Sequence, residues 1–500
     1  MSAALLLQWI LPLPLLGTVA IVLCHRHPNW REAVTLATSA LLFILVAWLS
    51  AELSWEQPPK LVLAEPLPGL TLALSPEPLG ILFALVASFL WPVTSVYAIG
   101  YMRSHGESHQ TRFYAAFAVS IAATLGIALA ANMFTLFLFY ELLTLATYPL
   151  VTHSGTAAAK RAGRLYLGLL MGTSIGFMLL AMVWTWQLTG TLDFTRGGIY
   201  PAQTESWILG TLLLLFVFGT GKAALMPFHR WLPAAMVAPT PVSALLHAVA
   251  VVKAGVFTVL KLVVYLFGLE RISTLAAADW LAYLAAFTII SASLVALTQD
   301  NLKARLAYST ISQLGYILLG AMLGVAAGVT GGSLHIVMHA FAKITLFFCA
   351  GAILVVTHKT QVSQLNGLGR RMPLTMLAFA VGSLSIIGLP PMGGTWSKWL
   401  LIQATLDSGA RMLTLVLLAS SLLNIAYLLV VPVRGFFGRA EAAVDTEGAD
   451  QTGTDTGAIK AGIYEAPWAC LLAIGITATG CIVLFFQADA ILQLTEGLLQ

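Results

Sequence analysis

The chain has 500 residues, of which 59% are hydrophobic and only 9% are charged, and its mean hydropathy is +0.89. A soluble domain carries roughly 25% charged residues, so this composition excludes a soluble globular protein and indicates an integral membrane protein. The net charge of +4 gives no indication of nucleic-acid binding, because the distribution of the positive residues among loops carries the information instead.

Apolar stretches of about 20 residues recur along the whole sequence, and each is long enough to cross a hydrocarbon core of about 30 Å as a helix. They lack the alternating pattern of barrel strands, so we predict an all-α bundle of transmembrane helices. Fourteen spans are expected, at about 3–24, 34–51, 79–100, 113–131, 133–152, 165–187, 207–235, 241–266, 280–298, 306–327, 332–356, 374–402, 412–432 and 466–487.

The predicted loops differ in charge. With the amino terminus outside, sixteen of the 25 Lys and Arg residues fall in inward-facing loops, four in outward-facing loops and five within spans. Cytoplasmic loops of helical membrane proteins carry the excess of Lys and Arg. We therefore expect a multi-pass protein of a bacterial inner membrane with both termini on the non-cytoplasmic side. The outer loop 52–78 is proline-rich and is expected to lie extended over the surface.

Proline and glycine interrupt two predicted spans, the seventh at MPFHRWLP (226–233) and the twelfth at GLPPMGGTW (388–396). These residues remove backbone hydrogen bonds, and the two spans cross the membrane in opposite directions. Paired broken helices point to an inverted repeat with an ion site near the midplane, although glycine and proline are frequent enough for coincidence. We expect spans 1–3 in 1–112, two inverted five-helix repeats in 113–266 and 280–432, a flexible cytoplasmic loop in 433–465, and the last helix in 466–500.

Five charged residues lie near the middle of apolar runs: Glu141, Lys222, Lys253, Lys343 and Lys398. Each buried charge costs about 2.5 to 3.5 kcal/mol on insertion scales, so a purely structural membrane protein is not expected to carry all five. Glu141 is expected to pair with Lys222, just before the first break, as a switch for proton movement. A fixed ion pair between two helices is the alternative.

Histidines accompany these lysines. His247 precedes Lys253 by six residues, and His335, His339 and Lys343 are spaced i, i+4, i+8, which places them on one helical face. Histidine titrates near neutrality and lysine does so once desolvated, so the set predicts a hydrated proton relay from Glu141 to an exit at Lys398. For His247 a hydrogen-bonded core residue is the alternative, and for Lys398 a side chain that snorkels to the interface. Lys261, near a span end, is expected to snorkel.

No cofactor or metal site is expected. The string GTGKAA departs from a phosphate loop at Phe216 and Ala223, and the His335–His339 pair has neither an intervening Glu nor an evident third ligand for zinc. The four cysteines form no CxxC pair. With no flavin, haem or iron–sulfur ligand set, the chain is expected to have no catalytic chemistry of its own beyond ion translocation.

Four motifs carry a family resemblance: FYELLTLATYPL, GKAALMPFHRWLPAAMVAPTPVSALLHAVAVVKAG, HIVMHAFAKITLFFCAG and GLPPMGGTWSKWLL. Over about 80–430 the chain resembles the proton-conducting antiporter-like family, which includes large subunits of Mrp-type antiporters and antiporter-like subunits of complex I and membrane-bound hydrogenases. The resemblance implies a fourteen-helix core, and it implies that Glu141, Lys222, Lys253, Lys343 and Lys398 line a water-filled route. At the twelfth-span position, where some family members have glutamate, this chain has Lys398.

The expected function is therefore proton translocation within a multisubunit cation/proton antiporter of the Mrp type, with other membrane subunits as partners and protons and Na⁺ as the transported ions. A pump module of complex I or a hydrogenase, driven by redox chemistry elsewhere, is the alternative within the family. A self-sufficient carrier for an organic solute and a scaffold that only helps its neighbours assemble are alternatives from other classes.

Overall fold

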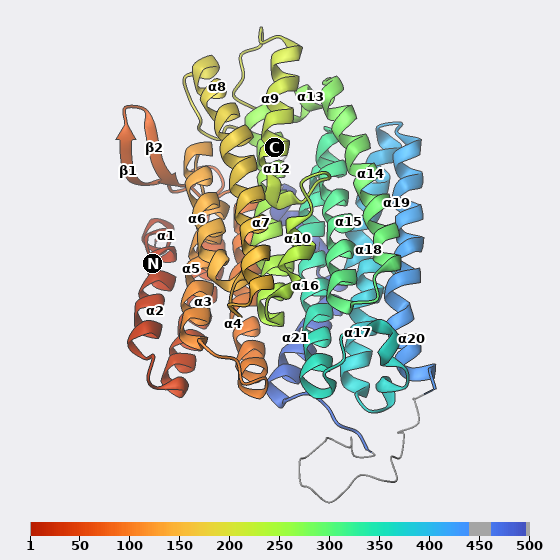
Figure 1. Cartoon of the computed structure of the whole chain (residues 1–500). Helices are drawn as coiled ribbons and strands as arrows, with labels where there is room; N and C mark the ends of the chain where they lie inside the picture. Colours follow the sequence, from red (N-terminus) through yellow and green to blue (C-terminus); the bar gives the residue numbers. More distant parts are fainter. Residues whose placement is uncertain (1, 440–461, 497–500) are drawn as a thin grey trace, which may run out of the picture.

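The structure is a computed structural model that describes residues 2–439 and 462–496. Most of its helices run side by side along one direction, and a small hairpin projects at one face (Figure 1). Within the described residues, eleven helices are long and apolar enough to cross a membrane. The predicted helical membrane architecture is confirmed, whereas the number of fourteen crossings stays a prediction. Most of the predicted loop 433–465 lies outside the described residues.

The amino-terminal part forms four helices and a β-hairpin. The hairpin lies between α3 and α4 and corrects the expectation of an extended loop at 52–78. Its strands are antiparallel, and Ala73 N donates to Thr135 Oγ1 at 2.9 Å, which fastens the hairpin to the start of α6. The bounds are α1 (Ala3–Ile10), α2 (Pro12–Leu23), α3 (Pro28–Glu52), β1 (Leu61–Leu67), β2 (Leu70–Leu74) and α4 (Pro78–Ser104).

The predicted first repeat contains long helices followed by a broken stretch. The segment Thr240–Phe267 is continuous but includes two π-helical turns, η4 and η5. The bounds are α5 (Gln110–Ala128), α6 (Met133–Val151), α7 (Ala157–Thr173), η1 (Ser174–Met178), α8 (Leu179–Thr189), α9 (Ser206–Gly219), η2 (Gly221–Ala223), α10 (Trp231–Ala234), η3 (Ala235–Val237), α11 (Thr240–Ala244), η4 (Leu245–Val249), α12 (Val251–Lys261), η5 (Leu262–Phe267) and α13 (Leu269–Ile272).

The predicted second repeat and the last helices follow. The two inverted repeats remain a prediction. The bounds are α14 (Ala276–Thr298), α15 (Leu302–Met322), α16 (Ala326–Thr357), η6 (Val362–Leu365), η7 (Leu368–Arg370), α17 (Pro373–Ile387), α18 (Gly394–Asp407), α19 (Arg411–Asn424), η8 (Ile425–Leu429), α20 (Val430–Phe437), α21 (Trp468–Phe486) and α22 (Ala488–Glu496).

Both predicted helix breaks are present, but the first begins earlier than expected. The helix before the second break ends at Ile387 and the chain resumes as α18 at Gly394. In the seventh span, α9 already ends at Gly219, so Lys222 lies inside the break and not before it. The reason is a contact from another helix: Lys222 N donates to Tyr140 Oη at 3.1 Å in place of a carbonyl of its own helix.

The centre of the molecule is formed by α12 and α16, which pack against each other. In Figure 1 they lie between the orange and yellow helices of the first part and the green and blue helices of the second. The span Thr240–Phe267 is the most deeply buried candidate crossing. Polar side chains on these two helices therefore lie far from the lateral surface.

Candidate functional site

Lys222 is held in the first break by α6. Its Nζ donates to the Tyr140 carbonyl oxygen at 2.8 Å and to Thr144 Oγ1 at 2.6 Å, and it lies 3.2 Å from the centre of the Tyr140 ring. The side chain is fully buried. One carbonyl oxygen, one hydroxyl oxygen and one aromatic ring thus surround the ammonium. These contacts reduce the free-energy cost of burying its charge.

The backbone around Lys222 is packed as closely as its side chain. Gly255 of α12 lies against the peptide between Lys222 and Ala223, where an added Cβ would collide with Ala223 N. Trp231 Nε1 donates to the Gly221 carbonyl oxygen at 3.0 Å across the break. The position of Lys222 is therefore set by α6, by α12 and by the far side of its own break.

The expected ion pair between Glu141 and Lys222 is not formed among the described residues. Both carboxylate oxygens of Glu141 are buried without a hydrogen-bond partner there. Tyr140 and Thr144, at i and i+4, share the face of α6 that meets Lys222, whereas Glu141 is turned about 100° away from Tyr140 around the helix. Leu138, Leu142 and Leu145 nearby on α6 are exposed, so Glu141 lies toward the lateral surface.

Lys253 and His339 join the two central helices. Lys253 Nζ of α12 lies 2.6 Å from His339 Nδ1 of α16, and both side chains are buried. The sequence places each residue in a hydrated path but does not pair them. The contact connects a lysine of the predicted first repeat to a histidine of the predicted second.

His335 continues this line toward the second break. Its ring lies 5.7 Å from that of His339 and 5.7 Å from that of Tyr316, and its Nδ1 is 2.9 Å from Ser397 Oγ of α18. One residue further along α18, Lys398 lies with its Nζ 4.8 Å from the centre of the Tyr316 ring. His335 and Tyr316 thus bridge the gap between His339 and Lys398.

Lys398 lies beside the second break, as expected. Its Nζ donates to Ser421 Oγ at 3.0 Å and to the Ile387 carbonyl oxygen at 3.2 Å. It also lines a pocket of about 390 Å³ bounded by Gly388, Trp399 and other residues of α17, α18 and α19. The residue is 5% exposed, which favours a buried lysine over the alternative of a side chain that snorkels to the interface.

Lys343 and His247 lie off this line. Lys343 Nζ donates to Ser309 Oγ at 2.7 Å, and Ser309 accepts a hydrogen bond from Tyr427 Oη at 3.1 Å. His247 lies in the π-helical turn η4 with its ring 4.6 Å from that of Phe347. Neither of its ring nitrogens has a hydrogen-bond partner in the part of the chain that the structure describes, so no protein group there supports the alternative of a hydrogen-bonded core histidine.

Lys261 corrects a second expectation. It is fully buried, with Nζ 2.7 Å from Glu77 Oε1 and donating to the Ala130 carbonyl oxygen at 2.7 Å. It does not snorkel to water. Glu77 precedes α4 and is distant from Lys261 in sequence, so nothing in the local pattern around either residue indicates the pair.

The groups that link the predicted residues are uncharged and were not predicted. They are Tyr140, Thr144, Ser309, Tyr316, Ser397, Ser421 and Tyr427. In the sequence, only their position within apolar runs could have indicated these residues. That indication is weak, because the hydroxyl of a serine or threonine in a helix often donates a hydrogen bond to the backbone carbonyl one turn earlier. Their role becomes visible only when the helices are packed.

The comparisons agree on one family. A family model described as NADH:quinone oxidoreductase/Mrp antiporter, TM, matches residues 130–424. The chain is 34% identical over 365 residues to NADH-quinone oxidoreductase subunit N of Desulforudis audaxviator, with 72% of this chain and 71% of that protein covered. It is 33% identical over 345 residues to NAD(P)H-quinone oxidoreductase chain 5 of Synechocystis, with 64% of this chain covered and 48% of the relative, about half of its length.

Two solved structures share the fold. A chain of the Mrp complex from Dietzia superposes with a TM-score of 0.85 at 22% identity and covers 99% of this chain and 96% of its own length. A chain of the membrane-bound sulfane sulfur reductase, an archaeal respiratory membrane complex, gives 0.83 at 24% identity, with 98% and 96% covered. The predicted multi-pass membrane architecture is therefore confirmed by sequence and by fold.

Proposed function

Because this chain belongs to the NADH:quinone oxidoreductase/Mrp antiporter transmembrane family, we propose that it is the proton-translocating subunit of a multisubunit, Mrp-like Na⁺/H⁺ antiporter. The observation that carries the proposal is the Lys253–His339 contact in the centre of the bundle. A buried amine against an imidazole can pass a proton in either direction, since either group accepts what the other releases.

The relay runs from Lys222 to Lys253, crosses to His339, and continues through His335 and Tyr316 to Lys398, with Lys343 and His247 on side branches. Water fills the gaps that side chains do not span. Each lysine gives up one proton to the next group and regains one from the previous group, so the net charge of the bundle is the same before and after a full transfer.

Glu141 acts as the switch at the start of this route. The Lys222 ammonium rests on Tyr140 and Thr144, and Glu141 is the residue next to Tyr140 on the same helix. A charge change outside the bundle, at the exposed side of α6, draws Lys222 to or away from Glu141 and thereby changes how readily Lys222 releases its proton. A neighbouring membrane subunit supplies that charge.

The protein is proposed to lie in a bacterial inner membrane with both termini on the non-cytoplasmic side. The imbalance of sixteen inward against four outward Lys and Arg residues supports this orientation. The partners are other membrane subunits, which fits the multisubunit complexes of both structural neighbours. Na⁺ is the proposed counter-ion.

A pump module of a complex I or hydrogenase type is the second candidate. The names of the sequence relatives, which are quinone oxidoreductase subunits, favour it. In this case electron transfer in partner subunits drives the same relay, and Na⁺ has no part in it.

One experiment separates the two candidates. The whole complex is purified, its subunits are identified, and proton flux is measured in vesicles with and without a Na⁺ gradient. Flux driven by Na⁺ in a complex without redox subunits supports the antiporter. Flux that requires an electron donor and ignores Na⁺ supports the pump. Flux that survives both Lys222→Ala and Glu141→Ala in an assembled complex would overturn the relay for either candidate.

A further inference from the structure

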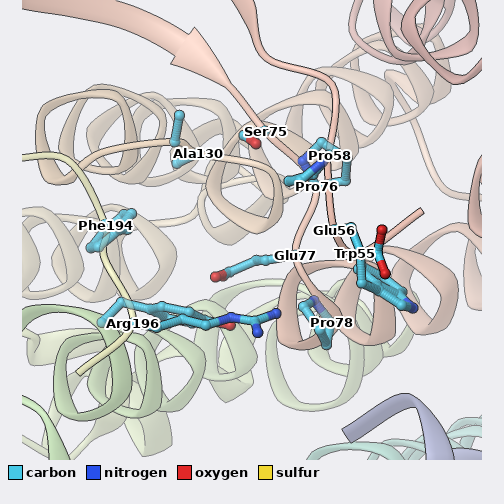
Figure 2. A pocket seen from close by; sticks show the side chains of 12 residues that line it. Trp55, Glu56, Pro58, Ser75, Pro76, Glu77, Pro78, Ala130, Phe194 and Arg196 are labelled. Carbon is cyan, nitrogen blue, oxygen red and sulfur yellow. The ribbon is translucent and has the colours of Figure 1, made fainter. Parts of the chain in front are cut away.

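A pocket of about 360 Å³ opens at the face of the bundle that bears the hairpin. Figure 2 shows Glu77 and Arg196 pointing into the space at its centre, with Phe194 on one side and Trp55 and Glu56 on the other. Four separate parts of the chain therefore form its wall: the 52–78 segment, the turn before α6, the loop after α8 and the end of the α12 region.

The inner end of this pocket is an ion pair. Glu77 lines the pocket and keeps 14% of its side chain exposed, whereas its partner Lys261 is wholly enclosed. Lys261 Nζ also lies 4.5 Å from the centre of the Phe194 ring. One partner of the pair therefore faces the pocket and the other faces the protein interior.

A second polar group, the Tyr265 hydroxyl, lies at the same place. Tyr265 lines the pocket and is 3% exposed, and its hydroxyl lies beside the Glu77 carboxylate. The pocket is large and polar enough to hold water, because Glu56, Glu77 and Arg196 are the charged groups on its wall.

Lys261 lies on the same helix as Lys253. It follows Lys253 by eight residues on α12, which corresponds to about 12 Å along a helix. The two lysines are both fully buried. The Glu77–Lys261 pair thus lies between the pocket and Lys253.

We propose that this pocket is a mouth of the proton route at the hairpin-bearing face, with Glu77 and Lys261 as the last proton-carrying pair before water. The inference rests on the proposed function. For release, the Lys261 ammonium transfers a proton to the Glu77 carboxylate, which leaves a neutral amine and a neutral acid. The acid then loses the proton to water in the pocket, and the amine regains one from Lys253 through water. Uptake is the reverse sequence.

The charge of the pair argues for transfer and not only for attachment. Burial raises the pKa of the Glu77 carboxyl above its ordinary value, although the Lys261 ammonium acts against this shift. A carboxyl with a raised pKa takes up a proton more readily than an exposed carboxyl, which suits a group that passes protons to water. The Lys60–Asp193 pair at the same face is 3.0 Å apart, about half exposed and outside the lining of the pocket, so it serves as the matched control.

The test uses the whole complex in vesicles. The double variant Glu77→Gln/Lys261→Met removes both charges together, so no unpaired charge stays buried. We expect proton flux to fall at least about tenfold, the lower range for loss of a proton-transfer group, in a complex that still assembles. The control Lys60→Ala/Asp193→Asn keeps its flux. An assembled double variant with unchanged flux would show that the pair only fastens the loop, and the proposal would be overturned.

A second measurement does not depend on removing the pair. Ser75 lines the pocket, so Ser75→Cys in a Cys24→Ser background accepts a bulky, membrane-impermeant thiol reagent at the mouth. Labelling is expected to reduce flux at least about tenfold, whereas labelling of Gln203→Cys, an exposed position on the same face outside the pocket, does not. Full labelling at Ser75→Cys without any loss of flux contradicts the proposal.

Failure of the mouth and failure of the relay give different results. If Lys253→Ala abolishes flux while the Glu77/Lys261 double variant and the labelled Ser75→Cys variant keep it, the relay stands and the mouth lies elsewhere. If Lys253→Ala also leaves flux intact, the proposed function itself is wrong.

Discussion

Lys253 Nζ and His339 Nδ1, on α12 and α16, are 2.6 Å apart in the centre of the bundle. The two residues come from different halves of the chain, and each is buried. Neither residue takes part in an ion pair with a carboxylate among the described residues, so no salt bridge there holds a proton on either side chain.

Lys253→Ala is expected to lower proton flux by roughly 100-fold, in the range for loss of a positioned proton-transfer group. The measurement is the initial rate of proton movement in vesicles that carry the whole complex. Lys160→Ala, at an exposed lysine of α7, is the control. Since the two partners act as a unit, Lys253→Ala/His339→Ala should lose little more than either single change. Flux equal to that of the control would remove Lys253 from the relay.

Thr144→Val tests whether the Thr144 hydroxyl holds the Lys222 ammonium beside α6. Valine keeps the shape of threonine but removes the oxygen that accepts from Lys222 Nζ at 2.6 Å. Loss of a hydrogen bond to a charged group costs about 1.5 to 3 kcal/mol, so the ammonium should leave Tyr140 and Thr144 more often. We expect flux to become less dependent on the driving ion gradient, measured as the slope of rate against gradient.

The control for Thr144→Val is Thr211→Val, because Thr211 Oγ1 donates to the Trp207 carbonyl oxygen in an exposed turn of α9. An unaltered slope in Thr144→Val, with normal assembly, would mean that the hydroxyl does not hold Lys222 during transport.

Much of the site was predictable because the strongest signals are local. A lysine in the middle of an apolar run is costly wherever the helix packs, so Lys253, Lys343 and Lys398 could be identified from their own segments. The second break, at 388–396, was predictable because proline and glycine interrupt a helix without help from neighbours. His335, His339 and Lys343 were recognised by their spacing on one helix.

The parts that sequence reasoning missed depend on contacts between distant segments. The first break begins before Lys222 because Tyr140 of α6 takes a backbone hydrogen bond, and no local pattern contains that information. Glu77 and Lys261 are likewise brought together only by packing. The hairpin is different: Leu61–Leu67 and Leu70–Leu74 flank Pro68 and Gly69, with Gly69 at φ +79, so a turn signal was present.

Gly255→Ala probes the close approach of α12 to the first break. The added methyl group would collide with the backbone at Ala223, and backbone cannot rotate out of the way as a side chain can. The break that carries Lys222 must shift, so we expect a large loss of flux and a lower midpoint of thermal unfolding. The readouts are flux in vesicles and unfolding of the detergent-solubilised complex.

Gly168→Ala is the matched control, because nothing lies within 4 Å of a Cβ added there. In a helix this change is expected to be neutral or to stabilise by about 0.5 to 1 kcal/mol. If Gly255→Ala behaved like Gly168→Ala in both measurements, α12 would not be needed to position the break.

Asp300, at the face opposite the hairpin, is expected to make the thermal stability of the protein depend on pH. Ser363 N and Ser363 Oγ donate to its carboxylate at 2.9 and 2.6 Å, and the hydrogen bond from the Ser363 hydroxyl lowers the pKa of Asp300 below its ordinary value, which is about 3.9. A carboxyl whose pKa is lower in the folded state contributes stability above the unfolded pKa and loses it as the pH falls through the folded pKa.

The difference in the midpoint of thermal unfolding between wild type and Asp300→Asn should thus be constant near neutral pH and shrink below about pH 4. Thermal unfolding from pH 3 to 7 measures this, with Asp407→Asn, an exposed aspartate of α18, as the control. A difference that stayed the same at all pH values would show that the Asp300 carboxylate does not hold the segment after α16.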